Sequence, residues 1–198
     1  ISKIKLIMRK YKILNNQKFH INEYSIIPIR DKDMYEIMKW RNEQIYHLRQ
    51  NNILSVKDQE NYFSEVVSNL FKMNEPNQLL FSFLEKEICI GYGGLVHINW
   101  IDKYAEISFV MNTSLEKDFF HKFWLIFLGL IEKVAFKELG LNKIFVYAFD
   151  VRSKLYEVLI DARFIKEARL KKHHKFKNEF IDVLIYSKLN KNESTNSN

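Results

Sequence analysis

Three consecutive residues, Trp40, Arg41 and Asn42, have side chains that suit recognition of a small anionic molecule. An aromatic ring stacks on a sugar or a base, and a guanidinium pairs with a phosphate through two parallel hydrogen bonds. The same residues also fit a structural role, with Trp40 in the core and Arg41 in a surface ion pair. They close a predicted helix that begins near Lys32, so we expect either a substrate-binding group or a packing group at its end.

A second group of polar side chains, Lys117, His121 and Lys122, lies near the start of a predicted long helix. Apolar residues recur at helical spacing over residues 114–139, and Gly140 follows as a left-handed helix cap. The amides and the dipole of a helix N-terminus favour negative charge. The start of this helix therefore has an electric field that suits an anion.

The histidines of the sequence do not predict a metal site. His47 and His97 are isolated, and His173 and His174 lie in the basic turn ARLKKHHKFKN (168–178), so local spacing assembles no ligand cluster. The turn combines several cations with one aromatic ring, a composition that suits contact with RNA or with a nucleotide-sugar diphosphate. A solvated hairpin loop is the interpretation that we prefer.

The elements that must position these residues centre on a strand–helix–strand unit. YAEISFVMN (104–112) alternates in the period of a strand, and KIFVYAF (143–149) is a short apolar run typical of a strand buried on both faces. With the helix of residues 114–139 between them, the two strands should be parallel and joined by a right-handed crossover.

The rest of the chain predicts further strands and helices around this unit. YSIIPIR (24–30) is a first strand, two helices follow up to Lys72, and residues 79–100 form a hairpin that turns at Glu85 and Lys86. Its glycines at positions 91, 93 and 94 lie in a strand pattern, which favours a bulge or a close backbone approach over a phosphate loop. The order β-α-α-β-β-β-α-β-α-β-β indicates an α/β domain with a mixed sheet and helices on both faces.

Composition and charge bound the possible classes of protein. With 198 residues, 47% of them hydrophobic, the chain fits one domain, which we place at 24–190, between a basic arm or added strand (1–23) and a disordered tail (191–198). No apolar run approaches the roughly 20 residues of a membrane span. The lone Cys89 suits a cytoplasmic protein. The net charge of +7 favours an anionic partner without choosing one.

Several strings together resemble a known superfamily. AEISF, a helix ending in FKELGLNKI, a strand, and a second helix DVRSKLYEVLIDARF that leads into a β-ribbon (176–189) resemble the core of the GCN5-related N-acetyltransferases (GNAT). Upstream, YSIIPIRDKDMYEIMKWRNEQ (24–44) is similar to the branch that holds ribosomal-protein and amino-sugar N-acetyltransferases. The resemblance implies a bacterial transferase with a mostly antiparallel sheet that is splayed at one parallel strand pair.

The resemblance also implies acetyl-CoA, or another acyl-CoA, as the acyl donor, with no metal. Its pantetheine arm would lie along Phe109, Val110 and Met111, with Arg152 at a place where relatives carry an asparagine that contacts this arm. The pyrophosphate would lie at the start of the long helix, over residues 115–122.

The coenzyme loop departs from the pattern of the family. The usual Arg/Gln-x-x-Gly-x-Gly/Ala is replaced by residues of SLEKDFFHKFW (114–124), which contains no glycine. Glycine lets the backbone approach a phosphate without a Cβ, so Phe119 and Phe120 either obstruct the site or pack in the core. We expect the three cationic side chains of this helix to compensate with charge.

Two residues are implied in proton transfer. Glu106 matches a position where many relatives carry a glutamate base, and burial would raise its pKa toward the working pH; strand alternation would equally place it on a solvated face. Tyr156 lies near the place of a tyrosine that reprotonates the coenzyme thiolate, although packing explains it as well.

Two functions of different classes follow. The first is an N-acyltransferase that moves an acyl group to a primary amine of a small molecule, with an amino-sugar nucleotide for surface polysaccharide as the leading acceptor and a ribosomal-protein N-terminus as the runner-up. The second is a non-catalytic GNAT-like module that has lost the coenzyme loop and uses its basic surface to bind RNA or a protein. Nucleic acid and membrane partners are disfavoured, and the chain is expected to be a monomer or a homodimer.

Overall fold

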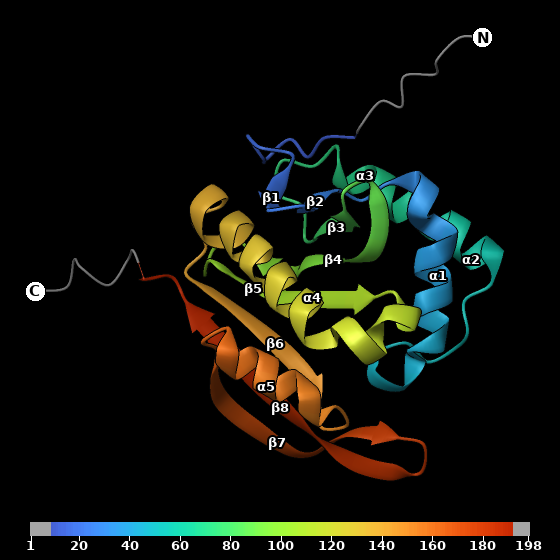
Figure 1. Ribbon diagram of the computed structural model, residues 1–198, viewed down its shortest axis with the longest axis vertical. Coiled ribbons are helices and arrows are strands. Elements are labelled where there is room, and N and C mark those ends of the chain that lie inside the picture. The colour runs from blue at the N-terminus through green and yellow to red at the C-terminus, as the bar shows by residue number, and fades with distance from the viewer. Residues whose placement is uncertain (1–8, 192–198) are drawn as a thin grey trace, which may run out of the picture.

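The computed structural model describes residues 9–191, which form one eight-stranded sheet in the order β1-β2-β3-β4-β5-β6-β8-β7 (Figure 1). Every neighbouring pair is antiparallel except β5 and β6, which are parallel. The strands are β1 (Phe19–Ile21), β2 (Tyr24–Pro28), β3 (Leu79–Glu85), β4 (Ile88–Asn99), β5 (Tyr104–Met111), β6 (Lys143–Phe149), β7 (Ile165–Phe176) and β8 (Glu179–Leu189). The predicted mixed, mostly antiparallel sheet is thereby confirmed.

The α-helices are α1 (Met34–Glu43), α2 (Val56–Asn61), α3 (Ser68–Leu70), α4 (Glu116–Glu132) and α5 (Ser153–Asp161). The predicted long helix is α4, continued by a π-helical segment through Glu138. It ends as predicted, because Gly140 has a φ of 61°, the left-handed conformation of a helix cap. None of the helices in the described part of the chain has the length and apolar character needed to cross a membrane.

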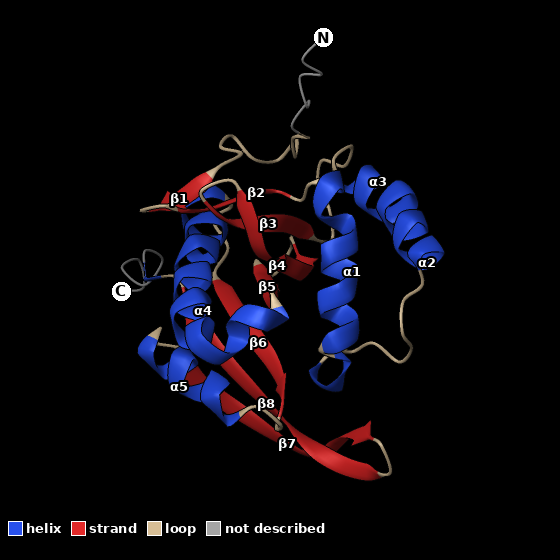
Figure 2. Cartoon of the chain, turned by 45° about the vertical axis from the view of Figure 1, so that its right-hand side comes forward, coloured by secondary structure: helices blue, strands red, loops and turns tan. Residues whose placement is uncertain are grey.

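Helices α1 and α4 cover opposite faces of the sheet. Neighbouring residues of a strand point to opposite sides. On β4, the hydroxyl of Tyr92 contacts Arg41 of α1, whereas a Cβ on Gly93 would meet Phe127 of α4. Figure 2 shows the two helices on either side of the central strands. The predicted placement of helices on both faces is confirmed.

The glycines of β4 mark close backbone approaches, as expected from their place in a strand pattern. A Cβ on Gly93 would lie 2.1 Å from the carbonyl oxygen of Ser108, and one on Gly94 would lie 1.8 Å from that of Leu79. Both neighbours belong to the strands that flank β4, so these positions admit only hydrogen.

The described part of the predicted basic arm, residues 9–23, packs on the domain. Tyr11, Leu14 and Phe19 are buried, and the hydroxyl of Tyr11 both donates to the carbonyl of Leu80 (2.8 Å) and accepts from its amide (2.9 Å). Strand β1 pairs with β2, as an added strand would. Residues 1–8 of the arm, and the predicted tail beyond Lys191, lie outside the described residues.

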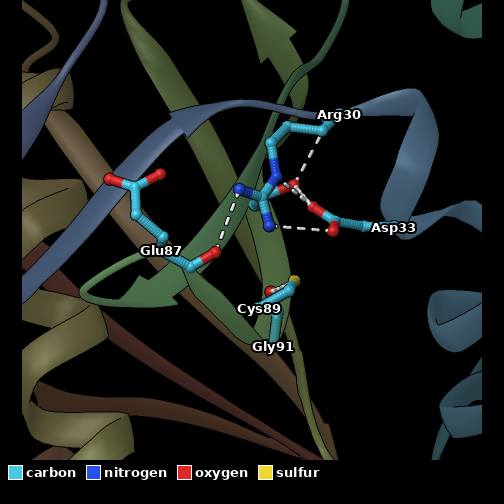
Figure 3. A network of polar contacts seen from close by, with 6 residues as sticks. Arg30, Asp33, Glu87, Cys89 and Gly91 are labelled. Atoms are coloured by element: carbon cyan, nitrogen blue, oxygen red, sulfur yellow. Dashed lines mark hydrogen bonds and ion pairs between the residues drawn. The ribbon is translucent and has the colours of Figure 1, made fainter.

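A buried polar network fixes the junction between β2 and α1 (Figure 3). Arg30 donates to both carboxylate oxygens of Asp33, at 2.6 and 2.9 Å, and to the carbonyl of Glu87. The hydroxyl of Ser82 donates to the same carboxylate at 2.6 Å. Burial raises the pKa of the adjacent Cys89 thiol to about 12, so this cysteine is a protonated packing group at neutral pH.

Strands β5 and β6 separate after a short paired stretch. Their register covers three pairs, from Tyr104 opposite Lys143 to Glu106 opposite Phe145, although both strands continue further. Beyond Glu106, β6 keeps its partner β8 but no longer pairs with β5. The sheet therefore opens at its parallel pair, and Glu106 lies where the opening begins.

Candidate active site

A cleft of about 620 Å³ occupies the opening between β5 and β6. Residues 107–109 of β5 line one wall and residues 146–149 of β6 line the other. The segment that follows α1 contributes His47 and Arg49 to the lining, and the start of α5 contributes Arg152. A cleft of this size accommodates a ligand of small-molecule dimensions.

Glu106 lies at the closed end of the cleft with its carboxylate almost fully buried, at 8% exposure. One oxygen forms an ion pair with Arg49, and the other lies 3.9 Å from Nε2 of His97. Burial raises the pKa of Glu106, while the nearby Arg49 and His97 oppose this shift. A carboxylate whose pKa is raised in this way is suited to accept a proton from an amine.

Two arginines from the helix α1 region enter the cleft. The guanidinium of Arg49 lies over the ring of Tyr147, 4.7 Å from its centroid, in addition to its pairing with Glu106. Arg41 donates to the hydroxyl of Tyr92 at 2.6 Å and to the side chain of Gln50 at 2.9 Å. Both cations are held by defined partners at the wall of the cleft.

Of the predicted group Trp40, Arg41 and Asn42, only Arg41 lines the cleft. Trp40 is 2% exposed and belongs to the core. The side chain of Asn42 accepts from the amide of Leu54 and donates to its carbonyl, so it fixes the loop before α2. Trp40 therefore has the packing role given as its alternative, Asn42 holds a loop, and ligand binding by Arg41 stays a prediction.

The predicted coenzyme-binding end of the cleft is cationic. Arg152, at the start of α5, pairs with Glu116 in the first turn of α4 and donates to Nε2 of His47 at 2.8 Å. Burial, followed by the charge of Arg152, lowers the pKa of His47 to about 3, so this ring is neutral. Lys154 lies 4.0 Å from the centroid of the Phe120 ring, beside Arg152.

The three side chains predicted to compensate for the missing glycines, Lys117, His121 and Lys122, do not all lie at the predicted coenzyme-binding end of the cleft. Lys117 is exposed in the first turn of α4. His121 pairs with Asp161 of α5 at 2.7 Å. The ammonium of Lys122 lies over the ring of Tyr24, 5.1 Å from its centroid, on the side of β2. Arg152 and Lys154 therefore stand closer to the helix start than Lys122 does.

The residues predicted along the coenzyme arm all have buried side chains. Of Phe109, Val110 and Met111, Phe109 also belongs to the lining of the cleft. Phe120 is buried beneath Arg152, and Phe119 is partly exposed and stacks on Phe123. Phe120 thus packs in the core, as one of the two alternatives expected.

Two buried donors in the cleft lining have no partner among the described residues. They are Nε1 of Trp124 and Nε of Arg152. Buried polar groups are nearly always hydrogen-bonded in native proteins. Because both residues line the cleft, the oxygens of a ligand bound there are candidate partners for these donors.

Tyr156 does not belong to the lining of the cleft in this structure. Its hydroxyl donates to Asp150 at 2.6 Å, and its ring stacks on Tyr186 of β8. Burial and the hydrogen bond to Asp150 raise its pKa. Leu155 is the residue of this helical turn that reaches the cleft.

Sequence reasoning missed Arg49, His97 and Tyr147 at the acceptor end. Arg49 lies in a connection without periodicity, so no local pattern marks it. His97 has a φ of 50° at the register shift between β4 and β5, an irregularity that strand alternation does not predict. Tyr147 was assigned to a buried strand but was not singled out. In residues 9–191, no three histidine, cysteine or acidic side chains gather as a metal site would require.

A mixed sheet that opens at its one parallel pair, with a buried carboxylate and several cations in the opening, defines the class of protein as a GNAT-type acyltransferase. Residues 26–185 match the Acetyltransferase (GNAT) domain family, and the chain belongs to this family. It is therefore an acyl-CoA-dependent N-acetyltransferase that acts on amines. The resemblance seen in the sequence is confirmed.

Solved structures share the fold. The spermidine N-acetyltransferase from Vibrio cholerae, in complex with CoA and spermine, superposes with a TM-score of 0.73 at 17% identity, over 86% of this chain and 97% of that one. A ribosomal L7/L12 α-N-protein acetyltransferase in complex with coenzyme A gives a TM-score of 0.72 at 12% identity, over 87% and 97% of the two chains. At these identities the likeness extends to the fold, and the acceptor must be argued from this chain's own cleft.

Proposed function

We propose that the cleft between β5 and β6 binds acyl-CoA at its Arg152 end and an amine at its Glu106 end. The observation that carries this proposal is that the sheet opens beyond Glu106 into a cleft lined by Trp124 and Arg152, whose buried donors Nε1 and Nε have no partner among the described residues. Arg152 and Lys154 supply positive charge for the diphosphate beside the N-terminus of α4.

In the proposed reaction, Glu106 takes the proton that the acceptor ammonium must lose. The freed amine nitrogen then forms a bond to the acyl carbonyl carbon, and the bond from that carbon to the coenzyme sulfur breaks. The electron pair of the broken bond goes to the sulfur, which leaves as a thiolate and takes up the second proton, the one that the nitrogen loses as the amide forms. The buried setting of Glu106 raises its pKa and so favours this role as base.

The acceptor in this proposal is a small primary amine. An amino-sugar nucleotide is the leading candidate, because Arg49 pairs with Glu106, Arg41 lines the same cleft, and guanidinium groups pair well with phosphates. The N-terminus of a ribosomal protein is the second candidate, which the shared fold with the ribosomal L7/L12 acetyltransferase favours. An acceptor screen with acetyl-CoA separates the two.

Replacing Arg152 with glutamine should weaken acetyl-CoA binding at least tenfold, or about 1.4 kcal/mol. The change removes a charge-assisted contact to the diphosphate, a type of contact that contributes about 1.5 to 3 kcal/mol. Calorimetric titration of the folded protein with acetyl-CoA measures the effect.

Lys122→Ala is the matched control, because this cation lies against Tyr24 and should leave the affinity unchanged. Equal losses in both variants would place the diphosphate on the other side of α4. Absence of binding to the wild-type protein at millimolar acetyl-CoA would remove the proposed function.

A further inference from the structure

The charges in the cleft restrict which amine can enter it. Among the described residues that line the cleft, Glu106 is the single carboxylate, whereas three arginines, Arg41, Arg49 and Arg152, face the same space. Arg152 is paired with Glu116 at the coenzyme end, so an acceptor with several ammonium groups would find one carboxylate, Glu106, and the guanidinium groups of Arg41 and Arg49. Because these charges act in a partly desolvated space, their effect on selection is larger than on an open surface.

The single carboxylate in the described lining of the cleft, that of Glu106, already forms an ion pair with Arg49. Arg49 is paired with Glu106 and stacked on Tyr147, so its guanidinium stands where the ammonium of an acceptor must approach the base. The other oxygen of Glu106 lies 3.9 Å from Nε2 of His97, so an incoming ammonium must share the carboxylate with Arg49 or displace it. Once Glu106 takes the proton, its carboxyl is neutral and Arg49 has lost its anionic partner. The displacement is feasible because the Arg49 side chain is 45% exposed and comes from the irregular segment between α1 and α2.

Displacement has a cost that depends on the acceptor. Once Arg49 leaves Glu106, its guanidinium has lost its anionic partner in a cleft that already holds Arg41. An amine without an anionic group, such as a polyamine, offers no replacement for that anionic partner. An amine that carries a phosphate or a carboxylate restores the pairing, with the ammonium on Glu106 and the anion on the guanidinium.

We propose that Arg49 is an exchangeable counter-ion of Glu106 that selects amines bearing an anionic group. Arg49 is thus a specificity-determining residue: it exchanges its carboxylate partner on the protein for one on the acceptor, while Arg41 reinforces the anion site from the same wall. This inference rests on the proposed function and narrows its acceptor class to anionic amines, with polyamines excluded.

Matched acceptor pairs test the inference through the ratio of kcat/KM for the anionic member to kcat/KM for the other member. Initial rates are measured at saturating acetyl-CoA for glucosamine 6-phosphate against glucosamine, for β-alanine against its amide, and for spermidine. The wild-type protein should prefer the anionic member of at least one pair by tenfold or more in kcat/KM, and should show its lowest kcat/KM with spermidine. The phosphate and carboxylate pairs show which anion is recognised.

The variant Arg49→Gln should reduce this preference to about threefold or less, mainly through a higher KM for the anionic member. Arg9→Gln serves as the matched control, because Arg9 pairs with Asp31 outside the cleft and its loss should leave the preference intact. The inference is overturned if the preference survives in Arg49→Gln. It is also overturned if the wild-type protein favours spermidine, or if it shows no preference for the anionic member in either pair.

Calorimetry distinguishes failure of the Arg49 inference from failure of the proposed function. If acetyl-CoA does not bind, the coenzyme assignment fails. If acetyl-CoA binds but no amine turns over, the same acceptor pairs are titrated into the CoA-saturated protein, and equal affinities within each pair overturn the Arg49 proposal.

Discussion

Replacing Glu106 with glutamine is expected to lower kcat/KM for amine acetylation by about 100- to 10,000-fold, the range that a positioned general base contributes. Glutamine keeps the size of the side chain but cannot accept the proton of the ammonium. Acetyl-CoA affinity should change little, because the coenzyme diphosphate is assigned to the opposite end of the cleft. Initial-rate kinetics with the best acceptor measure the loss, and thermal unfolding checks that the variant is folded.

The pH profile gives a second reading of the same residue. The base must be ionised, so wild-type kcat/KM should fall as the pH drops through the pKa of Glu106. Burial raises that pKa, which places the fall at a higher pH than an ordinary glutamate would give. Glu106→Gln should lose this acidic limb. Near-wild-type rates in the variant would show that another group removes the proton.

Gly94→Ala is expected to prevent stable folding. The added Cβ would lie 1.8 Å from the carbonyl oxygen of Leu79, and backbone on a paired strand cannot move away without breaking the ladder between β3 and β4. Since β4 also pairs with β5, the strand that carries Glu106, the damage would reach the active site. We expect a loss of more than about 4 kcal/mol, an exceptional value for one substitution.

Gly140→Ala is the matched control for this prediction. Nothing lies within 4 Å of its added Cβ, and the cost is confined to a left-handed φ of 61°. That strain amounts to about 1 to 2 kcal/mol. Urea unfolding of the two variants compares them, and a folded Gly94→Ala protein of near-normal stability would contradict the close approach of β3 and β4.

Local patterns carried most of the fold. The period of 104–112, the helical spacing after it and Gly140 as a cap specify neighbours along the chain, so the strand–helix–strand unit was predictable. The capping box of Ser55 and Asp58, with reciprocal side-chain bonds at the start of α2, is another feature set by residues close in the sequence. Such features depend on residues a few positions apart.

The site depended on contacts that no local pattern encodes. The alternation of the strand did not decide whether Glu106 lies on a buried or a solvated face. In the structure it is buried and pairs with Arg49, a residue 57 positions away in the sequence. The resemblance pointed to the start of α4, but the turn of the helix directs Lys122 toward Tyr24. Arg152 and Lys154 reach that helix start only because α5 packs beside α4.

Backbone NMR of the labelled protein during titration with acetyl-CoA tests the central claim most directly. The account predicts that amides of residues 107–111 and 146–149, together with the Nε1 proton of Trp124, shift on binding, while those of β1 and β2 stay in place. The Trp124 proton should move to the position of a hydrogen-bonded indole. Binding that shifts a different set of amides, and leaves the opening between β5 and β6 unperturbed, would contradict the assignment of this cleft as the active site.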